Sequence, residues 1–230
     1  MGKQLRQQRR GKGTSVYRSP SHRHVADIRY PRLDATSGTI EDLVHAPGRS
    51  GPLAKVDFAG RKVFLIAAEG MMVGEDVSYG VAGSIAPGNV VPISSVPEGT
   101  FVYNIEGQPG DGGKFVRTAG TSATVVSRGD KVVLLMPSGS FKSFDPRCAA
   151  SVGVVAGGGM KEKPFGKAGN KVHAYRSKSK ATFKVKGLAM NAVDHPHGGG
   201  GHPHVGKPST VSRNAPPGRK VGRLSPKRRK

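Results

Sequence analysis

The sequence predicts an all-β protein built from two small barrels, with an extended basic arm at each end. Charged and apolar residues are divided unequally along the 230 residues. The middle of the chain consists of short segments rich in Val, Ile, Phe and Thr, and Gly or Pro separates these segments from one another. Short strands at close spacing with such turn residues are typical of barrels and sandwiches rather than of βαβ units.

The two arms are defined by where the net charge of +22 lies. Residues 1–30 contain 8 basic and 1 acidic residue, residues 31–158 contain 11 and 12, and residues 159–230 contain 18 and 2. Apolar residues number 54 of 128 in the middle, but 8 of 30 and 19 of 72 in the ends. Low apolar content with high charge does not offset the entropy lost on ordering a chain. We therefore expect arms that take up structure on a polyanion and a middle that folds alone.

Six segments of the middle are predicted strands. In one of them Phe101, Tyr103 and Ile105 alternate with smaller or polar residues, which is the pattern of a strand with one buried face. The stretch around Gly88 and Pro92 is the predicted seam between the two barrels. The six segments are 53–58, 62–69, 100–106, 122–128, 130–136 and 148–155.

A neutral body with two cationic arms predicts a polyanionic partner. Charge alone leaves nucleic acid, an anionic membrane surface and a merely solubilising tail open. A membrane surface requires an amphipathic helix, which the 11 Gly and 7 Pro of residues 159–230 disfavour. The longest apolar run, 63–68, is far shorter than the ~20 residues of a spanning helix. With one cysteine and no apolar segment after the basic N-terminus, we expect a soluble intracellular protein that binds nucleic acid and no membrane.

Residues 194–204 hold four of the eight histidines. Imidazole suits zinc or copper, so a metal-dependent hydrolase using the cluster from His195 to His204 is an alternative function, although its Gly and Pro residues fix no ligand geometry. Asp194 could orient His195 as a general base, but adjacent side chains on an extended chain rarely face each other. We prefer a third interpretation. Four successive glycines allow close backbone approach to a packed surface, where neutral imidazoles contact RNA.

The other motifs of the chain predict no enzyme, cofactor or metal. The stretch from Gly201 to Lys207 matches the first part of a P-loop, but Pro208 stands where Ser or Thr would hold Mg²⁺. No G-x-S-x-G nucleophile elbow occurs. Cys148 lies in an apolar strand and is interpreted as a small buried side chain.

Several longer stretches resemble one known family. The most specific is GLAMNAVDHPHGGG at 187–200, and two more, GKGTSVYRSPSHRH and GKPSTVSRNAPPGRKVG, lie at 11–24 and 206–222. Together they resemble the archaeal branch of the universal large-subunit ribosomal protein two family. Ala192 departs from the Pro of many members, and the second HPH is not general. Four further stretches carry the resemblance: HAPGRSGPLAKV (45–56), PGNVVPISSVPEGTFVYNIE (87–106), PGDGGKFVRTAGTSA (109–123) and PSGSFKSFDPRCAASVGVV (137–155).

The resemblance implies four segments and a set of partners. The segments are a basic arm at 1–32, an OB-fold RNA-binding domain at 33–90, an SH3-like barrel at 91–158 and a Gly/Pro-rich basic arm at 159–230. The implied protein is a non-enzymatic, structural part of the large subunit of the cytoplasmic ribosome, a ribonucleoprotein of translation. Its partners would be large-subunit rRNA, neighbouring ribosomal proteins and, in the assembled ribosome, tRNA and the small subunit.

The resemblance also implies a role near the peptidyl-transferase centre, in subunit association and in tRNA binding. In that family the histidine of the DHP motif has been suspected of taking part in peptide-bond formation. Because the resemblance makes RNA the catalyst, we assign His195 a positioning role. The loop next to the centre would comprise Met190, Asn191, Asp194, His195, His197, Gly198, Gly199 and Gly200.

Basic side chains of the arms are the predicted rRNA ligands. Arg makes bidentate phosphate contacts, and each neutralised phosphate releases counterions. A chromatin-like DNA compactor that uses the same arms is the rival binding class. The predicted rRNA-binding residues are Arg9, Arg10, Arg18, His22, Arg23, Arg176, Lys184, Lys186, Lys207, Arg213, Arg219 and Lys220.

Overall fold

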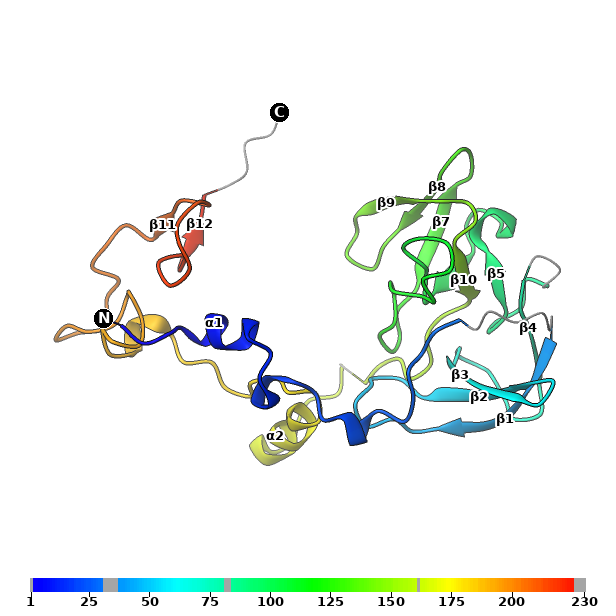
Figure 1. Cartoon of the computed structure of the whole chain (residues 1–230), viewed down its shortest axis with the longest axis horizontal. Helices are drawn as coiled ribbons and strands as arrows, with labels where there is room; N and C mark the ends of the chain where they lie inside the picture. Colours follow the sequence, from blue (N-terminus) through cyan, green and yellow to red (C-terminus); the bar gives the residue numbers. More distant parts are fainter. Residues whose placement is uncertain (1, 31–36, 81–83, 161, 226–230) are drawn as a thin grey trace. The chain divides into compact units, whose positions relative to one another are not determined.

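The computed structural model describes residues 2–30, 37–80, 84–160 and 162–225, and its contacts divide the chain into two compact units. Unit 1 combines the two ends of the chain, 1–20 and 167–230, and unit 2 comprises 21–166 (Figure 1). Among the described residues, none of the helices has the length and apolar character that a membrane crossing requires.

The first half of unit 2 forms a four-stranded antiparallel sheet in the order β3-β2-β1-β4. Its inner face buries Ile40, Val56 and Phe58. Gly38 lies directly under Phe58, where a Cβ would come within 2.7 Å of that ring, so the close packing of the two strands requires glycine. The strands are β1 (Ser37–Val44), β2 (Leu53–Phe58), β3 (Arg61–Ile66) and β4 (Asp76–Ser78).

The second half of unit 2 forms a six-stranded antiparallel sheet in the order β5-β10-β6-β7-β8-β9. Its own core contains Val102, Val125, Leu134 and Phe144, all nearly inaccessible to solvent. A single turn of 3₁₀-helix, Ile93–Ser95, follows β5. The strands are β5 (Val90–Pro92), β6 (Phe101–Tyr103), β7 (Ala123–Ser127), β8 (Val132–Leu135), β9 (Phe141–Phe144) and β10 (Ala149–Val152).

Tyr103 joins the two sheets of unit 2. It comes from β6, but its ring packs in the core of the first sheet, and its hydroxyl donates a hydrogen bond of 2.9 Å to the carbonyl oxygen of Ile66 in β3. Isolated bridges pair Ala68 with Val155 and Tyr79 with Val90. The two sheets therefore share a core and form one body.

The all-β fold class is confirmed. The predicted barrels are open sheets in the part of the chain that the structure describes, because β3 and β4 flank the first sheet and β5 and β9 flank the second without pairing to each other. Closure requires the two outer strands of a sheet to pair. The outer strands β4 and β5 are only three residues long and offer few backbone groups for such pairing.

Residues 21–30, which we call the N-terminal strap, belong to unit 2 and pack on its sheets. The strap begins with a 3₁₀ turn at Ser21–Arg23 and contributes Ile28 and Tyr30 to the buried core. Nη2 of Arg49 donates to the carbonyl oxygen of Ala26, and Nη2 of Arg117 donates to that of Ile28, each at 2.9 Å. The distribution of charge along the sequence assigns the strap to the N-terminal arm. In the structure it packs against the sheets of unit 2 instead.

Unit 1 contains short elements and a small core. Leu5 and Val221 are its buried apolar side chains among the described residues. The two ends of the chain are joined within it, because Lys3 donates its backbone N–H to the carbonyl oxygen of Val193 and Ser19 donates its hydroxyl to that of Ser177, both at 2.9 Å. Its elements are α1 (Arg6–Gly11), α2 (Ala168–Arg176), three-residue 3₁₀ turns at Ser15–Tyr17 and Gly187–Ala189, and the parallel pair β11 (Thr210–Val211) and β12 (Arg223–Leu224).

Candidate nucleic-acid interface

The two units differ sharply in charge. Unit 1 contains 22 of the 37 Lys and Arg residues and a single acidic side chain, Asp194. Unit 2 contains the other 15 basic residues and 14 acidic ones. The structure thus concentrates nearly the whole net charge in unit 1, which makes unit 1 the candidate surface for a polyanion.

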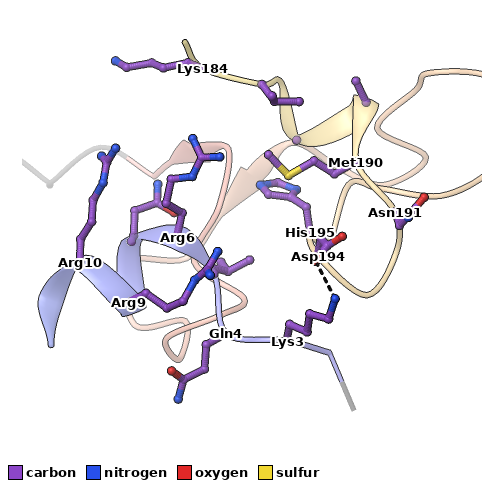
Figure 2. A pocket seen from close by; sticks show the side chains of 15 residues that line it. Lys3, Gln4, Arg6, Arg9, Arg10, Lys184, Met190, Asn191, Asp194 and His195 are labelled. Atoms are coloured by element: carbon purple, nitrogen blue, oxygen red, sulfur yellow. Dashed lines mark ion pairs between the residues drawn. The ribbon is translucent and has the colours of Figure 1, made fainter. Parts of the chain in front are cut away.

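A groove of about 860 Å³ crosses unit 1 between residues 3–10 and residues 184–195 (Figure 2). Helix α1 forms one wall. Leu5 anchors its start, because its side chain is buried and its backbone N–H donates to Oε1 of Gln8 at 2.7 Å, which satisfies one of the unpaired donors of the first turn. Arg6, Arg9 and Arg10 follow at positions i, i+3 and i+4, so they share one face of the helix and line the groove.

The opposite wall is the loop 187–200, whose shape depends on glycine. A Cβ on Gly187 would lie 2.3 Å from the His195 ring, so the imidazole rests directly on the bare backbone. A Cβ on Gly198 would lie 2.4 Å from the carbonyl oxygens of Met190 and Asn191. The sequence predicted that the glycines pack closely against another surface. In the structure, Gly198 packs against the backbone of the loop itself.

His195 is held in one tautomer. Its Nδ1 accepts a hydrogen bond of 3.0 Å from the backbone N–H of His197, which leaves the proton on Nε2. The two rings meet edge to face with centroids 5.1 Å apart. Partial burial, and secondly the neighbouring His197, lower the pKa of His195 below its ordinary value. Near neutral pH the groove therefore contains an uncharged imidazole with an N–H donor.

Asp194 contacts the N-terminal segment through an ion pair. Its carboxylate lies 3.7 Å from Nζ of Lys3, as the dashed line in Figure 2 shows. Both side chains are largely exposed, so the pair contributes little stability. The structure thus gives Asp194 a partner in Lys3, and His195 takes its orientation from the backbone of His197. Within the described ranges, no three His, Cys, Asp or Glu side chains come together to hold a metal ion.

The structure brings only part of the predicted site together. Arg9, Arg10, Lys184, Met190, Asn191, Asp194 and His195 line the groove, and His197 with Gly198, Gly199 and Gly200 continue the same loop. Arg18, Arg176, Lys186, Lys207, Arg213, Arg219 and Lys220 belong to unit 1 outside this lining. His22 and Arg23 lie in the strap of unit 2.

Sequence reasoning missed two residues of the groove, Lys3 and Arg6. The helical spacing of Arg6 with Arg9 and Arg10 is the signal that could have found the second. Lys3 has no local signal, because its place depends on a contact with Val193 and Asp194 at the other end of the chain.

Comparison with known proteins identifies the family. The family model described as "Ribosomal Proteins L2, C-terminal domain" matches residues 86–220, more than half of the chain. The chain belongs to the ribosomal protein L2 family. The predicted family membership is therefore confirmed.

Relatives of the L2 family match the chain along its whole length. The "Large ribosomal subunit protein uL2" of Thermoplasma acidophilum is 54% identical over 231 residues, covering 100% of this chain and 98% of the relative. Those of Methanothermobacter thermautotrophicus and Haloarcula marismortui are 52% and 49% identical over 236 and 233 residues, covering 99% of this chain and 98% and 97% of the relatives. The match of the L2 family model includes the loop 187–200, whereas α1 lies outside it but inside these full-length alignments.

Proposed function

We propose that the chain is a structural constituent of the large ribosomal subunit and binds large-subunit rRNA mainly through unit 1. One observation carries this proposal: unit 1 has 22 basic side chains and Asp194 as its single acidic one. Ion pairs within the unit can neutralise very few of these cations, and a surface with such an excess of positive charge attracts an external polyanion, whose binding releases counterions. The names of the relatives as large-subunit proteins support the rRNA of the large ribosomal subunit as that polyanion.

The two units would have different tasks. Unit 2 has nearly balanced charge, and its two sheets share a core, so it would serve as the folded body that docks onto the ribosomal subunit. Unit 1 has few buried apolar side chains, and phosphates that neutralise its cations would stabilise it. The predicted arginines and lysines of unit 1 would contact phosphates, with Arg18, Arg176, Arg213 and Arg219 forming bidentate contacts.

The finer roles are part of the same proposal and rest on the family resemblance. They are subunit association, tRNA binding, contact with neighbouring ribosomal proteins and support of the architecture around the peptidyl-transferase centre. For His195 we propose positioning without proton transfer. Its depressed pKa and its fixed tautomer suit a hydrogen-bond donor, and its neighbour Asp194 is engaged with Lys3.

The test is binding of the full-length protein to large-subunit rRNA fragments over a range of salt concentrations, with duplex DNA as competitor. We expect the log of the affinity to fall with the log of the salt concentration by ~0.7–0.9 per neutralised phosphate, and rRNA to be preferred. A flat salt dependence would contradict the proposal, and equal competition by duplex DNA would favour the DNA compactor. Sedimentation with ribosomal particles tests the assembly, and metal analysis of the purified protein tests the hydrolase alternative.

A further inference from the structure

We propose that the groove between residues 3–10 and 184–195 binds one unpaired RNA nucleotide, with its phosphates on the arginine wall and its base against Met190 and His195. The proposal rests on the rRNA binding proposed above and adds a place and a ligand class to it. All the lining residues belong to unit 1.

The arginine wall fits phosphodiester oxygens. Arg6, Arg9 and Arg10 present three guanidinium groups from one helix face, and Lys184, just before the loop 187–200, adds a fourth cation to the lining. Figure 2 shows the side chains of Arg6 and Arg10 extending from α1 on the side of the groove where Lys184 lies. The carboxylate in this lining, Asp194, is paired with Lys3, so it leaves the arginines to an external anion. Guanidinium groups bind phosphate oxygens in bidentate geometry.

The opposite wall fits a nucleobase. The imidazole of His195 and the thioether-bearing side chain of Met190 both line the groove from this wall (Figure 2), and each offers a polarisable surface for a flat ring. The Nε2–H of the neutral His195 can donate to a base nitrogen or carbonyl oxygen. One wall thus has side chains that bind phosphate, and the facing wall has side chains that contact a base. A single nucleotide can reach both.

The size and shape of the groove select an unpaired nucleotide over a duplex. Its volume of about 860 Å³ is that of a site that encloses a small ligand. A double helix keeps its bases stacked inside, so it could reach the arginines but could not place a base on His195. Sequence-tolerant readers of single-stranded RNA combine a cationic track with ring contacts in this way.

The test measures the affinity of the full-length protein for single-stranded octauridylate and for a blunt RNA duplex of equal charge, each at two salt concentrations. Arg6→Gln is matched with Arg223→Gln, which removes the same charge from unit 1 outside the groove. We expect Arg6→Gln to weaken octauridylate binding about tenfold and Arg223→Gln about twofold. Both variants should weaken duplex binding equally.

A second pair of variants replaces histidines, so it removes no formal charge. His195→Ala should weaken octauridylate binding about tenfold without changing the salt slope, because it removes a base contact and no phosphate contact. His173→Ala, at an exposed histidine of α2 in unit 1 outside the groove, should leave both affinities unchanged. Photocrosslinking of 4-thiouridine in the octamer should label residues within 3–10 or 184–195.

The outcomes separate the groove from the wider proposal. If Arg6→Gln binds like Arg223→Gln and His195→Ala binds like His173→Ala while the wild type keeps a steep salt dependence, the groove proposal is overturned and rRNA binding stands. Crosslinks outside both segments would also overturn it. If the wild type binds neither RNA, the proposed function itself fails.

Discussion

The phenolic hydroxyl of Tyr30 donates a hydrogen bond of 2.8 Å to the carbonyl oxygen of Asn104, although 74 positions separate the two residues. Because this proton is used, the hydroxyl of Ser151, also 2.8 Å away, donates to Tyr30. All three residues are buried, and burial raises the pKa of Tyr30 well above its ordinary value, so the phenol stays protonated. Buried hydrogen bonds therefore fix the strap to the sheets of unit 2.

Tyr30→Phe should lower the free energy of unfolding of unit 2 by about 1–3 kcal/mol. The substitution keeps the ring but leaves the buried Asn104 carbonyl without its donor and removes one hydrogen-bond partner of the Ser151 hydroxyl. Urea unfolding of the full-length protein, followed by circular dichroism of the β signal, measures the change. Tyr17→Phe in unit 1 is the matched control and should leave this transition unchanged. Equal midpoints for the two variants would mean that the strap is not fixed in solution.

A fragment comprising residues 21–166 should fold alone, whereas a fragment of 31–158 should unfold or aggregate. The longer fragment keeps Ile28, Tyr30 and the hydrogen bonds of Arg49 and Arg117, and the shorter one removes two core side chains. With 15 basic and 14 acidic residues, the 21–166 fragment should also bind rRNA with a much shallower salt slope than the full chain. An unchanged slope would place the phosphate contacts in unit 2. Circular dichroism and binding titrations provide the two readouts.

Local sequence patterns predicted strands that have one buried apolar face. They did not predict a strand whose formation depends on pairing with distant segments of the chain. The segment 53–58 coincides with β2, because alternating apolar residues there face the shared core. Strand β1, at Ser37–Val44, was missed because polar and charged residues follow Ile40, its one buried apolar side chain. It lies between β2 and β4, so backbone pairing from both sides holds it in the sheet.

The charge pattern of the sequence located the basic part of the chain but not how that part is built. It separated two arms that the structure joins into unit 1, because the contacts of Lys3 with Val193 and of Ser19 with Ser177 link residues more than 150 positions apart. It also placed the strap in an arm, because Arg23 and Arg29 make that segment basic while Ile28 and Tyr30 fix it in a core. The predicted loop residues from Met190 to His195 do line the groove, but the facing helix α1 could not be inferred from their motif.

The imidazole of His195 should titrate below the ordinary midpoint of 6.5 and should carry its proton on Nε2 above that midpoint. Desolvation, and secondly His197, lower the folded pKa. The neutral form is therefore favoured by folding, so the stability of the loop is complete above the unfolded pKa and declines as pH falls below it. Nitrogen-detected NMR of the full-length protein measures both the midpoint and the tautomer.

His197→Ala is the control for that titration. It removes the neighbouring ring but keeps the backbone N–H that donates to Nδ1 of His195, so the midpoint should rise only part of the way and the tautomer should not change. An ordinary midpoint in the wild type would show that His195 is solvated and that the loop is not formed in the free protein.

The glycine run 198–201 should tolerate alanine at Gly201 but not at Gly198 or Gly199. Gly198→Ala would place a Cβ 2.4 Å from two backbone carbonyl oxygens, and Gly199→Ala would force a side chain onto a backbone with φ of +87°. Gly201→Ala is the matched control, since nothing lies within 4 Å of its Cβ position and its φ is not positive. We expect the first two variants to weaken binding of a large-subunit rRNA fragment and Gly201→Ala to bind like the wild type. Equal losses at Gly198 and Gly201 would mean that the run acts through flexibility, whereas the expected asymmetry follows only if Gly198 packs on the carbonyls of Met190 and Asn191.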